Sequence, residues 1–349
     1  MRITIVTDAW KPQVNGVVRT LERLAYEARI LGYDISFVTP AQFKTIPLPY
    51  YPEISMSLTT RQKVAEAIKA LGADTLHIST EGPLGHLARS WAVKNNVPFT
   101  TCYHTHYPHY ISARFLVPEA WTYAYLRWFH SAAQATMVAT EDLKTTLQQN
   151  GFKNLKIWSR GVDGQLFKPR PNHRIYGEEP VFLCVARLAV EKNLEAFLSL
   201  DLPGKKVMVG DGPDRTHLQK IYKDVIFTGA LFGEELASAY AAADSFVFPS
   251  TSETFGLVLL EALASGLPIA AFPASGLLAE IQSVGLGVLD ADLKKAALQS
   301  LSIPREACRG YALGFSPSGN NAAIHRQYTQ CVESAISADC GLIETKNRV

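Results

Sequence analysis

The sequence has no run of about 18 apolar residues, the shortest that forms a membrane-spanning helix, although 47% of its 349 residues are hydrophobic. Its first residues, MRITIVTDAW, have the pattern of a strand entering a polar loop and not that of a signal peptide. Its five cysteines include no C-x-x-C pair, which argues against a structural zinc site and a disulfide framework. These absences predict a cytoplasmic protein. The length and the hydrophobic content are sufficient for the cores of two domains.

Two kinds of ligand-binding pattern are also missing. No G-x-G-x-x-G follows the expected strands at 3–6 and 181–185, and Gly210-Asp211-Gly212 is too short for a dinucleotide fingerprint. This argues against a hydride-transfer enzyme. His104 and His106 form a His-x-His pair, but no third ligand is evident, so a zinc site is disfavoured.

The net charge of +2 combines two unequal halves. Residues 1–170 carry 19 Lys and Arg against 12 Asp and Glu, a net of +7, whereas residues 171–349 carry 15 against 20, a net of −5. A basic half can attract an anionic surface. Because its cations form no run and no nucleic-acid-binding motif, nucleic acid is not expected as a partner.

Apolar strands alternate with helices along the chain, which predicts an α/β fold with parallel sheets. The alternation restarts near residue 181, so two similar domains are expected. A proline-containing linker at 168–172 divides them into predicted domains of 1–168 and 169–316, with a C-terminal helix and tail at 317–349 crossing back toward the first. The expected strands are 3–6, 35–39, 75–78, 99–103, 136–139, 181–185, 206–209, 225–228, 245–248 and 269–272, and the expected helices are 17–31, 61–71, 84–95, 141–149 and 257–264.

The run PSTSETFGLVLLEALASG at 249–266 is the most informative segment. It predicts a strand end, a polar loop and a helix over 257–264 that ends at Ser265-Gly266. Glu253 is expected in the loop, and Glu261 lies about 12 Å further along at a rise of about 1.5 Å per residue.

A phosphate group fits between these two carboxylates. The backbone amides of Phe255, Gly256 and Leu257 and the positive end of the helix form an anion site. Carboxylates on both sides of a phosphate site suit a nucleotide sugar, which has hydroxyls on both sides of its diphosphate. A Glu-x7-Glu pair alone is more often a pair of surface acids, so the neighbouring motifs decide.

Six motifs in order carry a family resemblance. The chain resembles the retaining nucleotide-sugar glycosyltransferases of family 4, which have the GT-B architecture of two Rossmann-like domains facing a cleft. It resembles bacterial GDP-mannose-dependent mannosyltransferases and glycolipid-forming glucosyl- and glucuronosyltransferases. The motifs are Thr7-Asp8-x3-Pro12-x2-Asn15-Gly16-Val17, Thr80-Glu81-Gly82-Pro83, His104-Thr105, Ala186-Arg187-Leu188-x2-Glu191-Lys192-Asn193, Val209-Gly210-Asp211-Gly212-Pro213 and the segment 249–266.

Arg187 and Lys192 follow the first strand of the second domain. Two cations there can neutralise a diphosphate and stabilise the departing nucleotide. The alternative is two solvated surface charges, which the glutamate motif disfavours.

The resemblance implies further donor contacts. Glu253 is expected to contact hydroxyls of the transferred sugar, Glu261 the ribose, and His104 the region of the donor sugar. Gly16 lets the first-domain loop approach the donor phosphates without a side chain, although a plain turn glycine is an equal alternative.

Four residues are candidates for the acceptor side: Asp8, Asn15, Glu81 and His106. Asp8 and Glu81 are loop acids, and either can orient an acceptor hydroxyl. The sequence does not choose a general base between them, and His106 is acceptor-side or structural.

No metal or other cofactor is expected. Asp290-Ala291-Asp292 matches the Asp-x-Asp signature of metal-dependent glycosyltransferases, but it precedes a Lys-rich helix and is better explained as an N-cap.

The expected reaction is transfer of mannose, glucose or glucuronic acid from a UDP- or GDP-linked donor to a hydroxyl, with retention. A membrane glycerolipid is the favoured acceptor, which places the enzyme peripherally on the inner face of the cytoplasmic membrane. Aromatic residues and arginines concentrate at 107–130, and a loop at 46–52 adds apolar side chains. The alternatives are a nucleotide-sugar epimerase of the same architecture and a non-catalytic nucleotide-sugar-binding protein.

Overall fold

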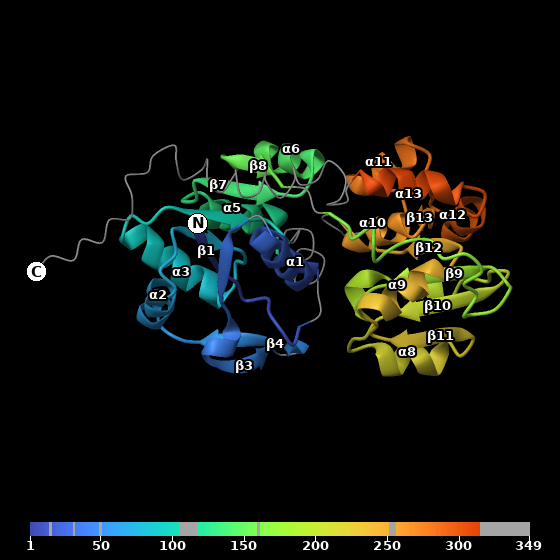
Figure 1. Cartoon of the computed structure of the whole chain (residues 1–349), viewed down its shortest axis with the longest axis horizontal. Coiled ribbons are helices and arrows are strands. Elements are labelled where there is room, and N and C mark those ends of the chain that lie inside the picture. The colour runs from blue at the N-terminus through green and yellow to red at the C-terminus, as the bar shows by residue number, and fades with distance from the viewer. Residues whose placement is uncertain are drawn as a thin grey trace, which may run out of the picture. The chain divides into compact units, whose positions relative to one another are not determined.

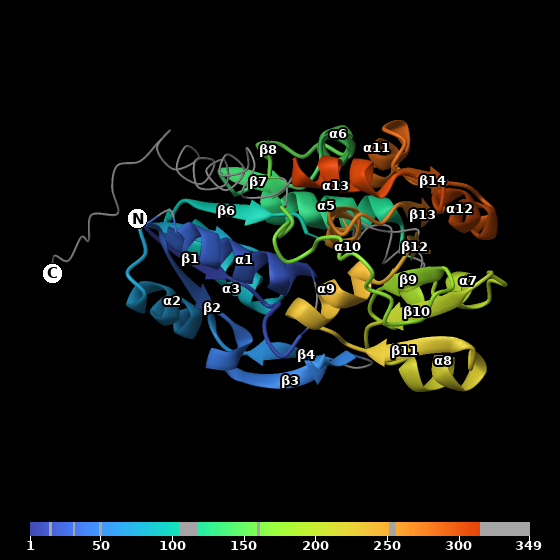
Figure 2. The same cartoon turned by 45° about the vertical axis from the view of Figure 1, so that its right-hand side comes forward.

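The computed structural model describes residues 1–13, 16–30, 32–48, 51–104, 117–158, 161–250 and 256–314. The chain divides between Ser159 and Arg160 into two compact units, whereas the predicted boundary lies at Lys168. Each unit has a parallel sheet between helices (Figures 1 and 2). The predicted helix and tail at 317–349 lie outside the described residues.

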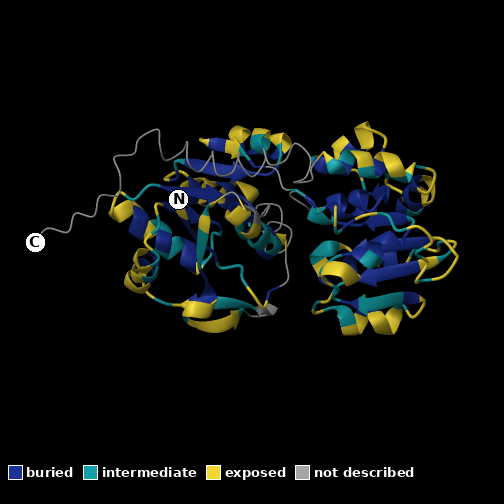
Figure 3. Cartoon of the chain, in the orientation of Figure 1, coloured by how far each residue is buried: buried dark blue, intermediate teal, exposed yellow. Residues whose placement is uncertain are grey.

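The first unit contains a six-stranded parallel sheet in the order β2-β1-β5-β6-β7-β8. Strands β1, β5, β6 and β7 are almost wholly buried because helices cover both faces, so they show no alternation of buried and exposed residues, and even the polar His77, Thr100 and Thr101 are buried (Figure 3). The strands are β1 (Arg2–Val6), β2 (Asp34–Val38), β5 (Thr75–Ile78), β6 (Phe99–Cys102), β7 (Ala135–Val138) and β8 (Leu155–Ile157); the helices are α1 (Gly16–Ile30), α2 (Arg61–Ala70), α3 (Pro83–Lys94), α5 (Glu119–His130) and α6 (Glu141–Gln149).

The second unit repeats this plan with the order β11-β10-β9-β12-β13-β14. Its core gathers apolar side chains from the sheet and its covering helices, including Phe182, Phe197 and Met208. The strands are β9 (Val181–Val185), β10 (Lys205–Val209), β11 (Val225–Gly229), β12 (Ser245–Phe248), β13 (Ile269–Ala271) and β14 (Gly287–Leu289); the helices are α7 (Glu195–Leu198), α8 (Arg215–Ile221), α9 (Gly233–Ala241), α10 (Leu257–Ala264), α11 (Leu277–Ser283), α12 (Leu293–Ser300) and α13 (Arg305–Leu313).

One prediction of local structure is wrong. The expected apolar loop at 46–52 is instead part of an antiparallel hairpin of β3 (Lys44–Leu48) and β4 (Tyr51–Leu58). Ile46 pairs with Met56 in this ladder. The prolines at 47 and 52 argued against strands in the sequence, because proline is rare in sheets except at edges and bulges.

The strand orders place a switch point in each sheet. In the first sheet, β1 lies between β2 and β5; in the second, β9 lies between β10 and β12. Successive connections leave to opposite sides there, so the loops after β1 and β5, and after β9 and β12, diverge and leave room for ligands at the carboxyl ends. The motifs that carry the family resemblance lie in or beside these loops.

Candidate functional site

In the second unit, the loop after β9 packs against the glycine-containing loop after β10. The backbone NH of Leu188 donates to the carbonyl oxygen of Asp211 at 3.0 Å. A Cβ at Gly210 would lie 1.9 Å from the carbonyl oxygen of Ala186, and one at Gly212 would lie 2.3 Å from that of Leu188. Glycine at both positions therefore allows the close packing that fixes the backbone on either side of Arg187.

The loop that carries Lys192 is joined to the turn after β12. Lys192 ends a 3₁₀ turn, Val190–Lys192, and Asn193 follows in the left-handed conformation with φ of 50°. The Asn193 side-chain amide donates to the carbonyl oxygen of Pro249 at 3.2 Å. This bond links the Lys192 loop to the segment that leads toward helix α10.

Helix α10 begins at Leu257, after Gly256 in a left-handed conformation with φ of 70°. The first amide groups of a helix have no partner within it, and the positive end of the helix dipole favours an anion. A helix therefore starts where the sequence predicted the phosphate site. Glu253 and Phe255, also assigned to that site, lie outside the described residues.

Glu261 is the fifth residue of α10 and only 7% exposed. The hydroxyl of Tyr240, on α9, donates to its Oε2 atom at 2.9 Å. Sequence reasoning missed Tyr240. The sequence signal that could have identified it is a tyrosine in an alanine-rich helix. A tyrosine buried in such a helix usually needs a hydrogen-bond partner for its hydroxyl.

In the first unit, Asp8 follows β1 and caps α3. Its Oδ1 accepts the NH of Leu84 at 2.8 Å, and its Oδ2 accepts the Thr80 hydroxyl at 2.8 Å and the NH of Gly85 at 3.2 Å. Gly82 leaves space for this carboxylate, because a Cβ there would lie 2.5 Å from Cγ of Asp8. Burial raises the pKa of Asp8, while the three hydrogen bonds oppose the increase. Both carboxylate oxygens therefore have structural partners.

His104 follows β6 and is 5% exposed. Its Nε2 atom lies 3.0 Å from the hydroxyl oxygen of Ser79, the residue after β5. Its ring packs edge-on against Trp158, with 6.3 Å between ring centroids. The imidazole is therefore held at the carboxyl edge of the sheet.

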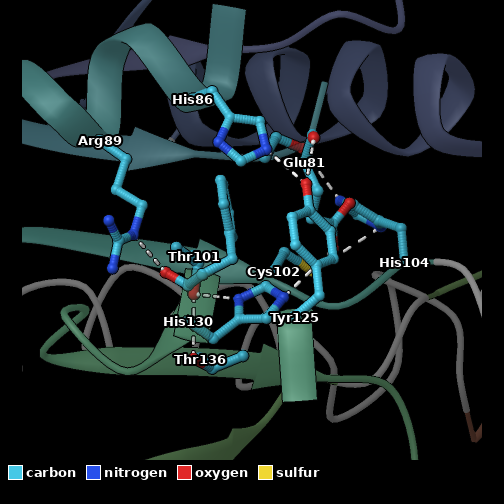
Figure 4. Close-up of polar contacts among 11 residues, drawn as sticks. Glu81, His86, Arg89, Thr101, Cys102, His104, Tyr125, His130 and Thr136 are labelled. Atoms are coloured by element: carbon cyan, nitrogen blue, oxygen red, sulfur yellow. Dashed lines mark hydrogen bonds and ion pairs between the residues drawn. The ribbon is translucent and has the colours of Figure 1, made fainter. Parts of the chain in front are cut away.

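Glu81 begins a buried polar chain that sequence reasoning missed. Its Oε1 atom lies 3.2 Å from Nε2 of His130, and both side chains are more than 90% buried. Nδ1 of His130 lies 2.9 Å from the hydroxyl oxygen of Thr101, which lies 2.9 Å from that of Thr136 (Figure 4). Helix α5 thus connects Glu81 with strands β6 and β7. The only signal in the sequence was His130 at the end of an aromatic segment. A histidine in such a position is too common to indicate that it pairs with Glu81.

The other candidates have separate positions. Gly16 begins α1, and a Cβ there would meet no described atom within 4 Å, so packing against the described residues does not require glycine. Asn15 and His106 lie outside the described residues.

Asp292 caps α12, as predicted, by accepting the NH of Lys295 at 3.1 Å. Lys295 also pairs with Asp290 at 2.5 Å. Among the residues that the structure describes, no group of three or more His, Cys, Asp or Glu side chains is arranged to hold a metal ion.

Comparison with known proteins confirms the family resemblance. Residues 14–166 match the model of Glycosyltransferase Family 4, and residues 179–301 match that of Glycosyl transferases group 1. A GDP-mannose-dependent alpha-mannosyltransferase of Mycobacterium tuberculosis is 30% identical over 306 residues, which cover 79% of this chain and 80% of that protein.

Two further relatives extend the comparison. The sulfoquinovosyl transferase SQD2 of Arabidopsis thaliana is 35% identical over 72% of this chain, and the alignment spans about half, 51%, of the plant protein. The alpha-monoglucosyldiacylglycerol synthase of Streptococcus pneumoniae is 28% identical over 78% of this chain and 71% of its own length.

Solved structures show the same fold. The sucrose-phosphate synthase of Thermosynechococcus elongatus has a TM-score of 0.77 at 21% identity, covering 97% of this chain and 100% of that one. Two six-stranded parallel sheets with covering helices are the GT-B arrangement. The chain belongs to glycosyltransferase family 4 and is a glycosyltransferase with the GT-B fold.

Proposed function

We propose that this glycosyltransferase transfers a hexose, which is mannose, glucose or glucuronic acid, from a UDP- or GDP-linked donor to a hydroxyl of a membrane glycerolipid, with retention. Arg187 and Lys192 neutralise the diphosphate, the start of α10 at Leu257 binds a phosphate, and Glu261 binds the ribose. The connected loops around Arg187, Lys192 and Pro249 support this donor site. Retention rests on the family. The roles of Glu253 and His104 toward the sugar and of Gly16 toward the phosphates stay predictions.

The lipid acceptor is supported by one observation on helix α5. Trp121, Tyr125 and Trp128 lie at i, i+4 and i+7 and are 73%, 43% and 52% exposed, so they share one face. Tyr123 and Phe129 are buried, as expected for part of this aromatic segment. The same helix carries His130, which holds the acceptor-side candidate Glu81. An exposed aromatic face is therefore joined directly to the proposed acceptor site.

The charges around this face suit an anionic membrane surface. The guanidinium of Arg89 lies 4.1 Å from the centre of the Trp128 ring, and residues 1–159 of the first unit carry 16 Lys and Arg against 11 Asp and Glu, a net charge of +5. Aromatic side chains with arginines are typical of the headgroup interface. Within the described residues, no helix is long and apolar enough to cross a bilayer. The proposed contact is a peripheral one, at the inner face of the cytoplasmic membrane.

Sedimentation with vesicles, combined with a transfer assay to diacylglycerol, tests the proposal. The protein should bind anionic but not neutral vesicles, and binding should fall with salt because surface attraction is screened over about 8–10 Å. The double variant Trp121→Ala/Trp128→Ala should lose vesicle binding. Phe232→Ala, which removes an exposed aromatic from the second unit, is the matched control. Indifference to anionic vesicles together with efficient transfer to a water-soluble acceptor would contradict the lipid proposal.

A further inference from the structure

We infer that Glu81, and not Asp8, binds the acceptor hydroxyl, and that His130 is the positioning residue that holds the Glu81 carboxylate for this task. The inference rests on the proposed transfer to a hydroxyl acceptor and names the residue that binds this hydroxyl. It does not depend on whether the acceptor is a lipid.

The position of Glu81 is the first support. Glu81 lies two residues beyond Ser79, whose hydroxyl contacts His104, at the carboxyl edge of the sheet beside the β1–β5 switch point. Ligands of open α/β sheets bind at such edges. Its side chain is only 6% exposed, and a carboxylate removed from water to this degree needs hydrogen-bond partners.

The two carboxylates differ in how many of their oxygens are used. Both oxygens of Asp8 accept hydrogen bonds from Thr80 and the start of α3, which leaves Asp8 as a helix cap. Glu81 accepts from His130 through Oε1. Across the described part of the chain, no hydrogen bond to Oε2 of Glu81 occurs. An acceptor hydroxyl that donates to Oε2 would complete the hydrogen bonding of this carboxylate.

His130 is held in a defined orientation by the threonine pair. With Thr101 donating to Nδ1 and accepting from Thr136, the Nε2–H of His130 points at Oε1 of Glu81. Because a carboxylate only accepts, its contact with Nε2 requires the proton on that nitrogen, and the Thr101 hydroxyl can donate to Nδ1.

The backbone of Glu81 is held by the same helix. The hydroxyl of Tyr125 donates to the Glu81 carbonyl oxygen at 3.5 Å and contacts Nε2 of His86 (Figure 4). Helix α5 thus restrains both the side chain and the main chain of Glu81. This rigidity is what a residue that orients a substrate hydroxyl requires, because catalysis by positioning tolerates little displacement.

The test measures acceptor kinetics and nucleotide affinity for Glu81→Gln, His130→Ala and His130→Gln. Glu81→Gln should lower kcat/KM for the acceptor by about 10- to 150-fold, the loss expected for one hydrogen bond to a charged group, while the Kd for UDP or GDP stays unchanged. His130→Ala should raise the acceptor KM. His130→Gln, which keeps an NH donor near Oε1 of Glu81, should recover part of the loss.

A second buried histidine provides the control. His77 on β5 pairs with Thr100 through Nδ1 at 2.8 Å, whereas the side chain of Glu81 pairs with His130. His77→Gln should lower thermal stability without changing the acceptor KM. A wild-type acceptor kcat/KM in Glu81→Gln, or an equal effect of His77→Gln and His130→Gln, would overturn the inference and leave the glycosyltransferase proposal standing. If Glu81→Gln does not fold, the comparison of His130→Gln with His77→Gln decides. Absence of transfer by the wild-type protein to every hydroxyl acceptor would overturn the proposed function, and the inference with it.

Discussion

The hydroxyl of Tyr240 lies 2.9 Å from Oε2 of Glu261. This bond joins two helices of the second unit and orients a carboxylate that is 7% exposed. Packing also holds the tyrosine ring, which meets Phe167 edge-on and lies beside Phe246. A carboxylate oriented before the ligand arrives loses little entropy when it binds a ribose hydroxyl.

Replacing Glu261 by alanine should therefore weaken nucleotide-sugar binding by about 1.5–3 kcal/mol, the range for a hydrogen bond to a charged group. Tyr240→Phe should have a smaller effect of about 0.5–1.5 kcal/mol, because it removes only the bond that orients Glu261. Titration calorimetry with the nucleotide sugar measures both. Tyr311→Phe, which breaks a second Tyr–Glu pair with Glu280, should leave donor affinity unchanged. Unaltered affinity in Glu261→Ala would contradict the ribose assignment.

Removing Arg187 or Lys192 should lower turnover more than it weakens acceptor binding, because the charge on the diphosphate grows as it leaves. For each single alanine variant, kcat should fall by about 10²–10³-fold, comparable to the removal of one preorganised donor in other enzymes. Lys205→Ala is the matched control, since Lys205 pairs with Glu179 at the surface of the same unit. Steady-state kinetics on both substrates provide the measurement. Near-wild-type transfer by the double alanine variant would exclude this phosphate site.

Asp8→Asn should destabilise the first unit by about 1–3 kcal/mol, because the asparagine NH₂ group cannot accept the bonds that one carboxylate oxygen now accepts. Urea unfolding measures the change in free energy. Asp142→Asn, at an exposed position in α6, should have almost no effect. A variant of unchanged stability that has lost affinity for the acceptor would instead make Asp8 an acceptor-binding residue.

Chelation of divalent ions should leave most of the transfer activity intact. Asp292 caps α12, and Asp290 pairs with Lys295, so both carboxylates have structural partners. Asp292→Ala should cost about 1 kcal/mol of stability, as loss of an N-cap does, with little effect on kcat. Transfer assays with EDTA and thermal unfolding check these expectations. Complete loss of activity that Mn²⁺ or Mg²⁺ restores would make Asp290 and Asp292 metal ligands.

Local sequence signals were sufficient for much of the fold. Strands 75–78, 181–185 and 245–248 and helices 141–149 and 257–264 have the predicted bounds. The strands at 181–185 and 245–248 are mostly apolar runs buried on both faces, and Thr140 caps the helix at 141–149, so neighbouring residues carry the information. The order and spacing of the motifs likewise identified the family, because each motif is a continuous segment of the chain.

Tertiary contacts decided the rest. The β3–β4 hairpin depends on pairing between segments whose prolines argue against strands, and β8 and β14 are three-residue strands that a sheet edge stabilises. The bond between Tyr240 and Glu261 spans 21 residues, and that between Glu81 and His130 spans 49.

The roles of the two candidate acids of the first unit also depended on contacts between distant segments. In the sequence, Asp8 and Glu81 are equivalent acids in loops that follow strands. Only the fold brings the start of α3 onto Asp8 and the end of α5 onto Glu81, 76 and 49 residues away in the chain. The role of a carboxylate is set by the donors that surround it, and here those donors come from distant segments.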